Sequence, residues 1–157
     1  MRKELTLSYE YFESWKELSE DDQELVNRAL HVMDSAYAPY SNFKVGTSLR
    51  LSNKLIINGS NQENVAFPSG LCAERVALFY AGANYPDLSV NTLCVVASGD
   101  LLPQDKLLSP CGGCRQVMME TESRQGKNIR VILVSQNNSV VVFNNAKSLL
   151  PLAFEAE

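Results

Sequence analysis

Apolar positions spaced three to four residues apart predict a helix in the first third of the chain. In SEDDQELVNRALHVMDSAYAP (19–39), one face of such a helix would carry Leu25, Ala29 and Val32. The segment opens on Ser19 with the pattern of a helix cap, and Pro39 ends it. Two further stretches, CAERVALFYAGAN (72–84) and CGGCRQVMMETES (111–123), also predict helices. Each of these two helices would begin at a cysteine.

Between the helices the pattern changes to one typical of strands. FKVGTSLRL (43–51) and KLIINGS (54–60) are apolar segments separated by Ser52 and Asn53, which indicates a hairpin. Near-continuous apolar runs at 92–98, 128–135 and 139–143 predict buried strands, whereas residues 4–12 predict a short strand or an extended arm. This order of elements predicts an α/β fold, a three-layer α/β/α sandwich around one mixed five-stranded sheet. In such sheets ligands bind at strand ends, next to helix N-termini. The two helices that begin at a cysteine would have their N-termini at this edge of the sheet.

Composition and charge narrow the class of protein. A chain of 157 residues with 45% hydrophobic and 20% charged residues is typical of one globular domain. A net charge of −4 without basic clusters argues against a nucleic-acid partner. The sequence has no apolar run long enough for a membrane span, and none of signal-peptide length at its start, so we expect a cytoplasmic protein. In that compartment four cysteines favour metal binding or catalysis over disulfides.

The four cysteines divide into one core residue and three candidate ligands. Cys94 lies in the middle of a predicted buried strand, where a free cysteine acts as a small hydrophobe. Cys111 and Cys114 form a C-x-x-C pair, which alone indicates a metal site or a redox pair. Cys72, also at a helix start, favours metal, because helix N-termini stabilise thiolates. Three protein ligands and an open fourth position are typical of catalytic zinc, and His31, alone on the first helix, is not expected to be a fourth ligand.

Glu74 lies two residues after Cys72 and is the candidate proton carrier. Taken alone, it could be a first-turn helix glutamate that the helix dipole favours. However, the order C-x-E followed by P-C-x-x-C is the three-cysteine form of the zinc nucleobase deaminase signature. Zinc at Cys72, Cys111 and Cys114 with Glu74 as general acid and base is therefore the preferred interpretation.

The sequence resembles the small homotetrameric cytidine deaminases over residues 19–154. The resemblance lies in YAPYSNFKVG (37–46), GSNQENVAFPSGLCAER (59–75), SPCGGCRQV (109–117) and LLPLAF (149–154). It implies hydrolytic deamination of cytidine and deoxycytidine in pyrimidine salvage, by a zinc-bound hydroxide with Glu74 as proton shuttle. It also implies one zinc per chain and a homotetramer with shared active sites. The single domain would span residues 1–157, with residues 1–18 an N-terminal extension of unknown role.

The resemblance assigns roles to further residues. A guanidinium that donates to thiolate sulfurs would offset the extra negative charge of a three-cysteine zinc site. The implied roles are Arg75 for that guanidinium, Phe43 against the pyrimidine, Asn61 and Glu63 on the ribose hydroxyls, the Ala73 backbone on the base amide, the Ser109 carbonyl near the departing ammonia, and Phe154 in a neighbouring subunit's site. Two positions depart from the family pattern. Phe67 stands where many members have tyrosine, and Thr47 where alanine is usual.

Two other functions are compatible with the thiols. A deaminase of the blasticidin type, acting on a modified aminopyrimidine nucleoside, would share the zinc motifs. The NQEN segment (61–64) favours an ordinary ribose instead. A zinc-stabilised interaction module without chemistry would keep the cysteines but would not need Glu74.

Overall fold

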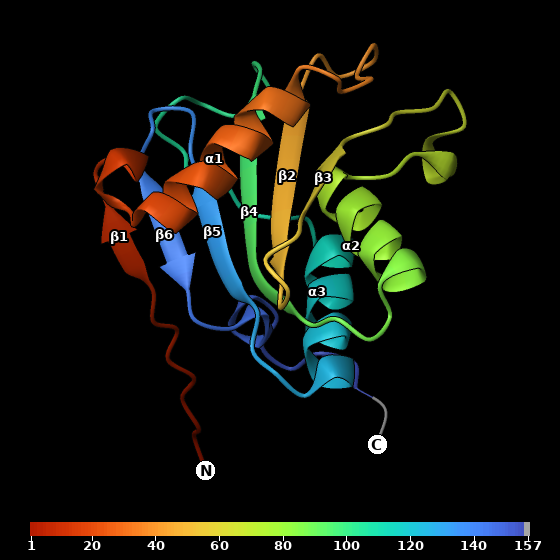
Figure 1. The fold of residues 1–157 in the computed structure, drawn as a ribbon. Helices are drawn as coiled ribbons and strands as arrows, with labels where there is room; N and C mark the ends of the chain where they lie inside the picture. Colours follow the sequence, from red (N-terminus) through yellow and green to blue (C-terminus); the bar gives the residue numbers. More distant parts are fainter. Residues whose placement is uncertain (156–157) are drawn as a thin grey trace.

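The protein is a three-layer sandwich in which one mixed sheet lies between helices on both faces (Figure 1). The computed structural model describes residues 1–155; residues 156 and 157, the end of the predicted domain, lie outside this description. The strands are β1 (Glu10–Phe12), β2 (Lys44–Leu51), β3 (Ile56–Ser60), β4 (Val90–Ser98), β5 (Arg130–Val134) and β6 (Val140–Phe143), in the order β1-β6-β5-β4-β2-β3. The helices are α1 (Glu20–Met33), α2 (Ala73–Asn84) and α3 (Gly112–Gln125), with short 3₁₀ turns at Trp15–Glu17, Phe67–Ser69 and Ala146–Leu149.

The pairing of the strands makes the sheet mixed, as predicted. β4 and β5 are parallel, and the other neighbouring strands within residues 1–155 are antiparallel. α3 connects the parallel pair, which needs a crossover of this length. The three predicted helices and the predicted hairpin are confirmed, and the Ser19 side chain caps α1 by accepting from the Asp22 N–H.

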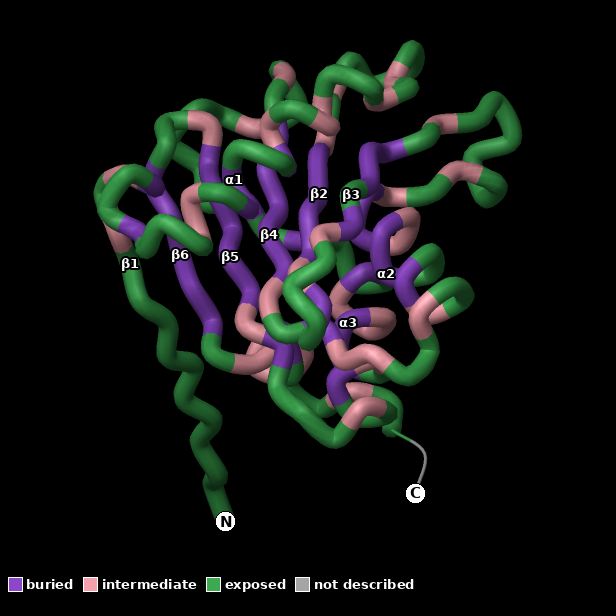
Figure 2. Tube along the Cα trace, viewed as in Figure 1, coloured by how far each residue is buried: buried purple, intermediate pink, exposed green. Residues whose placement is uncertain are grey.

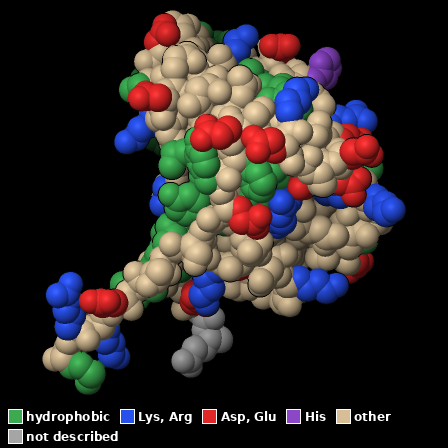
Figure 3. Space-filling view, turned by 90° about the vertical axis from the view of Figure 1, so that its left-hand side faces the viewer, with side chains coloured by type: hydrophobic (Ala, Val, Ile, Leu, Met, Phe, Trp, Pro, Cys, Tyr) green, Lys and Arg blue, Asp and Glu red, His purple; other side chains and the backbone are tan. Residues whose placement is uncertain are grey.

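Within residues 1–155 the sheet has six strands instead of the expected five. The additional strand is β1, which pairs with β6 so that Tyr11 lies opposite Val141. Its partner lies about 130 positions later in the chain, so local alternation over a few residues could not identify the pairing. Trp15 and Leu18, which follow β1, are buried against α1. The extension therefore adds an edge strand and core residues, and residues 1–9 leave the sheet as an exposed arm (Figures 1 and 3).

Two apolar layers, one on each face of the sheet, form the core (Figure 2). α1 covers one face with Leu25, Val26 and Ala29, which are fully buried. α2 and α3 cover the other face. Cys94 is fully buried in the α1 layer, where burial raises the pKa of its thiol, as expected for a core cysteine. None of the helices within residues 1–155 is long and apolar enough to cross a membrane.

A glycine on β3 lets α2 approach the sheet closely. A Cβ added at Gly59 would lie 2.6 Å from the carbonyl oxygen of Ala73 and 2.8 Å from the backbone nitrogen of Ala77. Because such distances are too short for any side chain, only glycine permits this approach. The first turn of α2 is thereby held against the sheet; Cys72 directly precedes this turn, and Glu74 lies in it.

Candidate active site

Three cysteine sulfurs meet where α2 and α3 begin. Cys72 is the residue before α2, Cys111 is the residue before α3, and Cys114 lies buried in the first turn of α3. The three sulfurs lie within 4.8 Å of one another, and those of Cys72 and Cys111 are 3.8 Å apart. Tetrahedral zinc with Zn–S bonds of about 2.3 Å separates two sulfurs by about 3.8 Å, so the cluster fits one zinc ion. Within residues 1–155 no other group of three potential ligands is so close, and His31 lies outside it.

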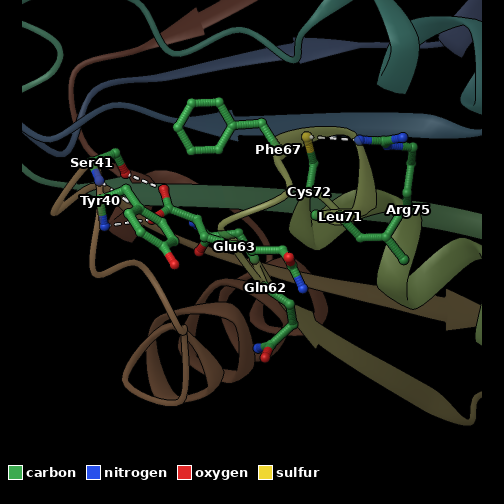
Figure 4. Close-up of a pocket in the computed structure, with 11 residues that line it drawn as sticks. Tyr40, Ser41, Gln62, Glu63, Phe67, Leu71, Cys72 and Arg75 are labelled. Atoms are coloured by element: carbon green, nitrogen blue, oxygen red, sulfur yellow. Dashed lines mark hydrogen bonds between the residues drawn. The ribbon is translucent and has the colours of Figure 1, made fainter.

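The thiols of the cluster differ in acidity. The pKa of Cys72 is lowered to about 5 because its sulfur accepts a hydrogen bond from Cys114 and interacts with Arg75. The pKa of Cys114 is raised because its thiol donates to Cys72 and is buried. Arg75 Nη2 lies 3.5 Å from the Cys72 sulfur, in position to donate to it (Figure 4). The site therefore favours a thiolate at Cys72, the form that binds metal.

Glu74 lies next to this cluster and is almost completely buried. Its side chain is in the first turn of α2, and the residue is 4% exposed. Burial raises its pKa to about 7, and the negative charge of Cys72 acts in the same direction. A carboxyl group with such a pKa can both donate and accept a proton near neutral pH.

A pocket of about 500 Å³ adjoins the cysteine cluster (Figure 4). Cys72 and Arg75 line one part of it, and residues 40–41 and 61–64 line another. This volume is suitable for a small organic ligand. The pocket brings together four of the predicted site residues: Asn61, Glu63, Cys72 and Arg75.

Asn61 and Glu63, predicted to contact ribose, also hold the chain around the pocket. The Asn61 amide donates to the Phe43 carbonyl at 2.9 Å, and its oxygen accepts from the Val45 N–H at 2.8 Å. Asn61 thereby fixes the start of β2 next to Phe43. Glu63 accepts from the Tyr40 N–H at 2.9 Å and from the hydroxyl and N–H of Ser41 (Figure 4). These hydrogen bonds lower the pKa of Glu63, which keeps it ionised.

The pocket is also lined by Tyr40, Ser41 and Phe67, to which the sequence assigned no role. The rings of Tyr40 and Phe67 meet edge to face with centroids 5.9 Å apart. Phe67 is 74% exposed, so it forms an open rim. Tyr40 and Ser41 belong to the YAPYSNFKVG segment, but their proximity to Glu63 depends on a contact over more than twenty residues.

The remaining predicted residues lie outside the lining of this pocket. Phe43 is half-buried against the core, and Ala73 is fully buried under the first turn of α2. Ser109 is exposed, and its hydroxyl accepts from Arg115. Phe154 is 84% exposed, and its carbonyl accepts from Gln116. The Phe154 side chain therefore has little cover from the rest of the described chain.

Comparison with known proteins agrees with this geometry. Residues 19–129 match the model of the cytidine and deoxycytidylate deaminase zinc-binding region. The chain belongs to this family. Over 137 residues it is 36% identical to a cytidine deaminase of Halalkalibacterium halodurans, covering 87% of this chain and 96% of that protein. A cytidine deaminase of Sporosarcina psychrophila is 35% identical, covering 87% of this chain and 93% of that one.

A solved structure extends the likeness to three dimensions. The crystal structure of cytidine deaminase from Burkholderia pseudomallei superposes with a TM-score of 0.72 at 35% identity, covering 87% of this chain and all of that chain. The predicted fold and zinc cofactor are thus confirmed, and the cluster of three cysteines fits the single zinc site of this deaminase family.

Proposed function

We propose that this protein catalyses the hydrolytic deamination of cytidine and deoxycytidine to uridine or deoxyuridine and ammonia. The observation that carries the proposal is the clustering of three thiols at two helix starts, with the buried carboxyl of Glu74 in the adjoining turn. Membership of the zinc-binding deaminase family supports it, as do the curated relatives that bear the name cytidine deaminase.

The metal ligands in this proposal are Cys72, Cys111 and Cys114, which would hold one Zn²⁺ per chain and leave a fourth position open. A zinc ion bound there supplies Lewis acidity and lowers the pKa of a coordinated water toward neutrality. Arg75 offsets part of the negative charge of the thiolates through its contact with the Cys72 sulfur.

Glu74 moves the protons of the reaction. Its carboxylate accepts one proton from the attacking water and passes it to ring nitrogen 3, while the water oxygen bonds to ring carbon 4. It then takes the remaining hydroxyl proton and passes it to the exocyclic nitrogen. The bond between carbon 4 and that nitrogen breaks, and ammonia leaves. A pKa near 7 suits a group that must give and take protons in one cycle.

The substrate contacts follow from the placement of polar groups around the pocket. Asn61 keeps unused amide hydrogen-bonding capacity after its bonds to Phe43 and Val45, and Glu63 is an anchored carboxylate, so both can bind ribose hydroxyls. We assign Phe43 to the pyrimidine face, the Ala73 backbone to the base amide, and the Ser109 carbonyl to the departing ammonia.

We also infer a cytoplasmic homotetramer in which neighbouring subunits complete each site. The exposed Phe154 ring and the half-exposed Phe79 and Tyr80 on α2 offer apolar surface for such contacts. Nucleic acid is not an expected partner, because acidic and basic side chains are interspersed on the face in Figure 3 and the net charge is −4.

The test is an ultraviolet assay of cytidine loss by the zinc-loaded protein, with Glu74→Gln as an isosteric control. The parent should convert cytidine, whereas Glu74→Gln should keep its zinc and lose about 10²–10⁴-fold in rate. Zinc binding without any cytidine loss would indicate a non-catalytic zinc module. Turnover of a blasticidin-type nucleoside but not cytidine would indicate the other deaminase class.

A further inference from the structure

Arg115 makes three hydrogen bonds that join two distant segments of the chain. It lies half-buried in the first turn of α3, directly after Cys114. Its Nε donates to the Pro110 carbonyl at 2.8 Å, and its Nη2 donates to the Ser109 hydroxyl at 2.6 Å. Its Nη1 donates to the Leu149 carbonyl at 3.1 Å. All three acceptors are uncharged, so the geometry of the planar guanidinium, more than ion pairing, selects arginine here.

Two of these bonds hold both sides of one peptide group. The Ser109 hydroxyl precedes the Ser109–Pro110 peptide bond, and the Pro110 carbonyl follows it. The proline ring additionally restricts the backbone at this point. The Ser109 carbonyl lies between these two held points, so the two hydrogen bonds constrain its direction. The same contacts fix the entry of the chain into Cys111.

The third bond belongs to a set by which α3 holds the C-terminal segment. Leu149 ends the 3₁₀ turn Ala146–Leu149, and Glu122 accepts from the Ala146 N–H at 2.6 Å. Gln116, next to Arg115, donates to the Phe154 carbonyl at 2.8 Å. Among the hydrogen bonds of residues 1–155, those of Arg115 alone join this segment to the Ser109–Pro110 loop.

We propose that Arg115 is a positioning residue that couples the Ser109–Pro110 loop to the C-terminal segment and thereby orients the Ser109 carbonyl for the deamination. It acts through Ser109 and does not itself contact substrate. The catalytic part of this inference rests on the proposed function, whereas the mechanical coupling between the two segments does not. Lysine cannot replace arginine in this role, because one ammonium group cannot reach the three acceptors that the planar guanidinium group of arginine contacts.

The experiment compares Arg115→Lys and Arg115→Ala with a matched control, Arg124→Lys. Arg124 lies on the exposed surface at the other end of α3. Three quantities are measured in each protein: zinc per chain, kcat and KM for cytidine, and hydrogen–deuterium exchange of peptides covering residues 107–111 and 146–155. Arg115→Lys should keep zinc and KM but lose up to about 10²-fold in kcat, as expected when a reacting group is misplaced. Exchange should accelerate in both segments at once, and Arg124→Lys should change none of these quantities.

Several results would overturn the proposal. Arg115→Lys with the kcat of the parent would exclude the positioning role, and faster exchange in only one segment would exclude the coupling. Loss of zinc in Arg115→Lys would show that Arg115 instead supports the backbone that carries Cys111 and Cys114. If Arg115→Ala fails to fold, the measurements on Arg115→Lys alone test the positioning role. If the parent does not deaminate cytidine, the proposed function fails, and the exchange data still decide whether Arg115 couples the two segments.

Discussion

Two neighbouring hydroxyls on β2 should have opposite effects on stability. Thr47 and Ser48 are both fully buried. The Ser48 hydroxyl donates to the Leu25 carbonyl at 2.6 Å, whereas the Thr47 hydroxyl has no hydrogen-bond partner among the described residues. We therefore expect Thr47→Val to stabilise the protein and Ser48→Ala to destabilise it.

The magnitude follows from the burial of each group. Leaving a buried hydroxyl unpaired costs about 1–3 kcal/mol, and a buried methyl contributes about 0.8 kcal/mol. Valine keeps the β-branched shape between Val95 on β4 and Gly59 on β3. Allowing for imperfect packing, Thr47→Val should raise the free energy of unfolding by about 1–2 kcal/mol, which raises Tm by about 2–8 °C. Ser48→Ala should lower the free energy of unfolding by about 1 kcal/mol.

Thermal and denaturant unfolding of the zinc-loaded proteins measure both changes, with zinc content as a check that the metal site is intact. A Thr47→Val protein that unfolds at a lower temperature than the parent would contradict this prediction. That result would mean that the Thr47 hydroxyl is hydrogen-bonded in solution.

Three further predictions concern the site. Cys94→Ala should leave zinc per chain unchanged, whereas Cys114→Ser should lower it, because Cys114 belongs to the sulfur cluster and Cys94 does not; elemental analysis showing zinc loss in Cys94→Ala would contradict the ligand set. Cytidine should be deaminated far faster than free cytosine or single-stranded DNA, because the role we propose for Asn61 and Glu63 directs binding energy to the sugar; equal kcat/KM values would remove that role. Deleting residues 152–157 should lower activity while zinc is retained, because we propose that the exposed Phe154 ring enters a neighbouring subunit's site; a fully active truncated protein, or a parent that sediments as an active monomer, would argue against shared sites.

The parts of the site that could be predicted from the sequence are those set by local structure. Cys72 and Cys111 stand directly before helices, and Glu74 follows within one turn, so their placement needed only the helix boundaries. The three-cysteine signature then specified the chemistry, and the structure brings the sulfurs together. The buried strands could likewise be predicted, because near-continuous apolar runs require cover on both faces.

The parts that could not be predicted depend on contacts between distant residues. β1 pairs with a strand about 130 positions away, and its three residues carry too little pattern to reveal that partner. The Glu63 carboxylate accepts hydrogen bonds from Tyr40 and Ser41, which lie more than twenty residues earlier in the chain. Arg115 donates to the Leu149 carbonyl, which lies 34 residues later in the chain. Such contacts follow from the packed sheet and helices, and no local spacing encodes them.

The central claim is that one zinc ion held by three cysteines makes this chain a cytidine deaminase. Its most direct test is a titration of the metal-free protein with Zn²⁺, in which bound metal and the rate of cytidine loss are measured on the same samples. Activity should rise in proportion to bound zinc and stop rising at one zinc per chain. Cytidine loss without zinc, or a fully zinc-loaded protein that leaves cytidine unchanged, would contradict it.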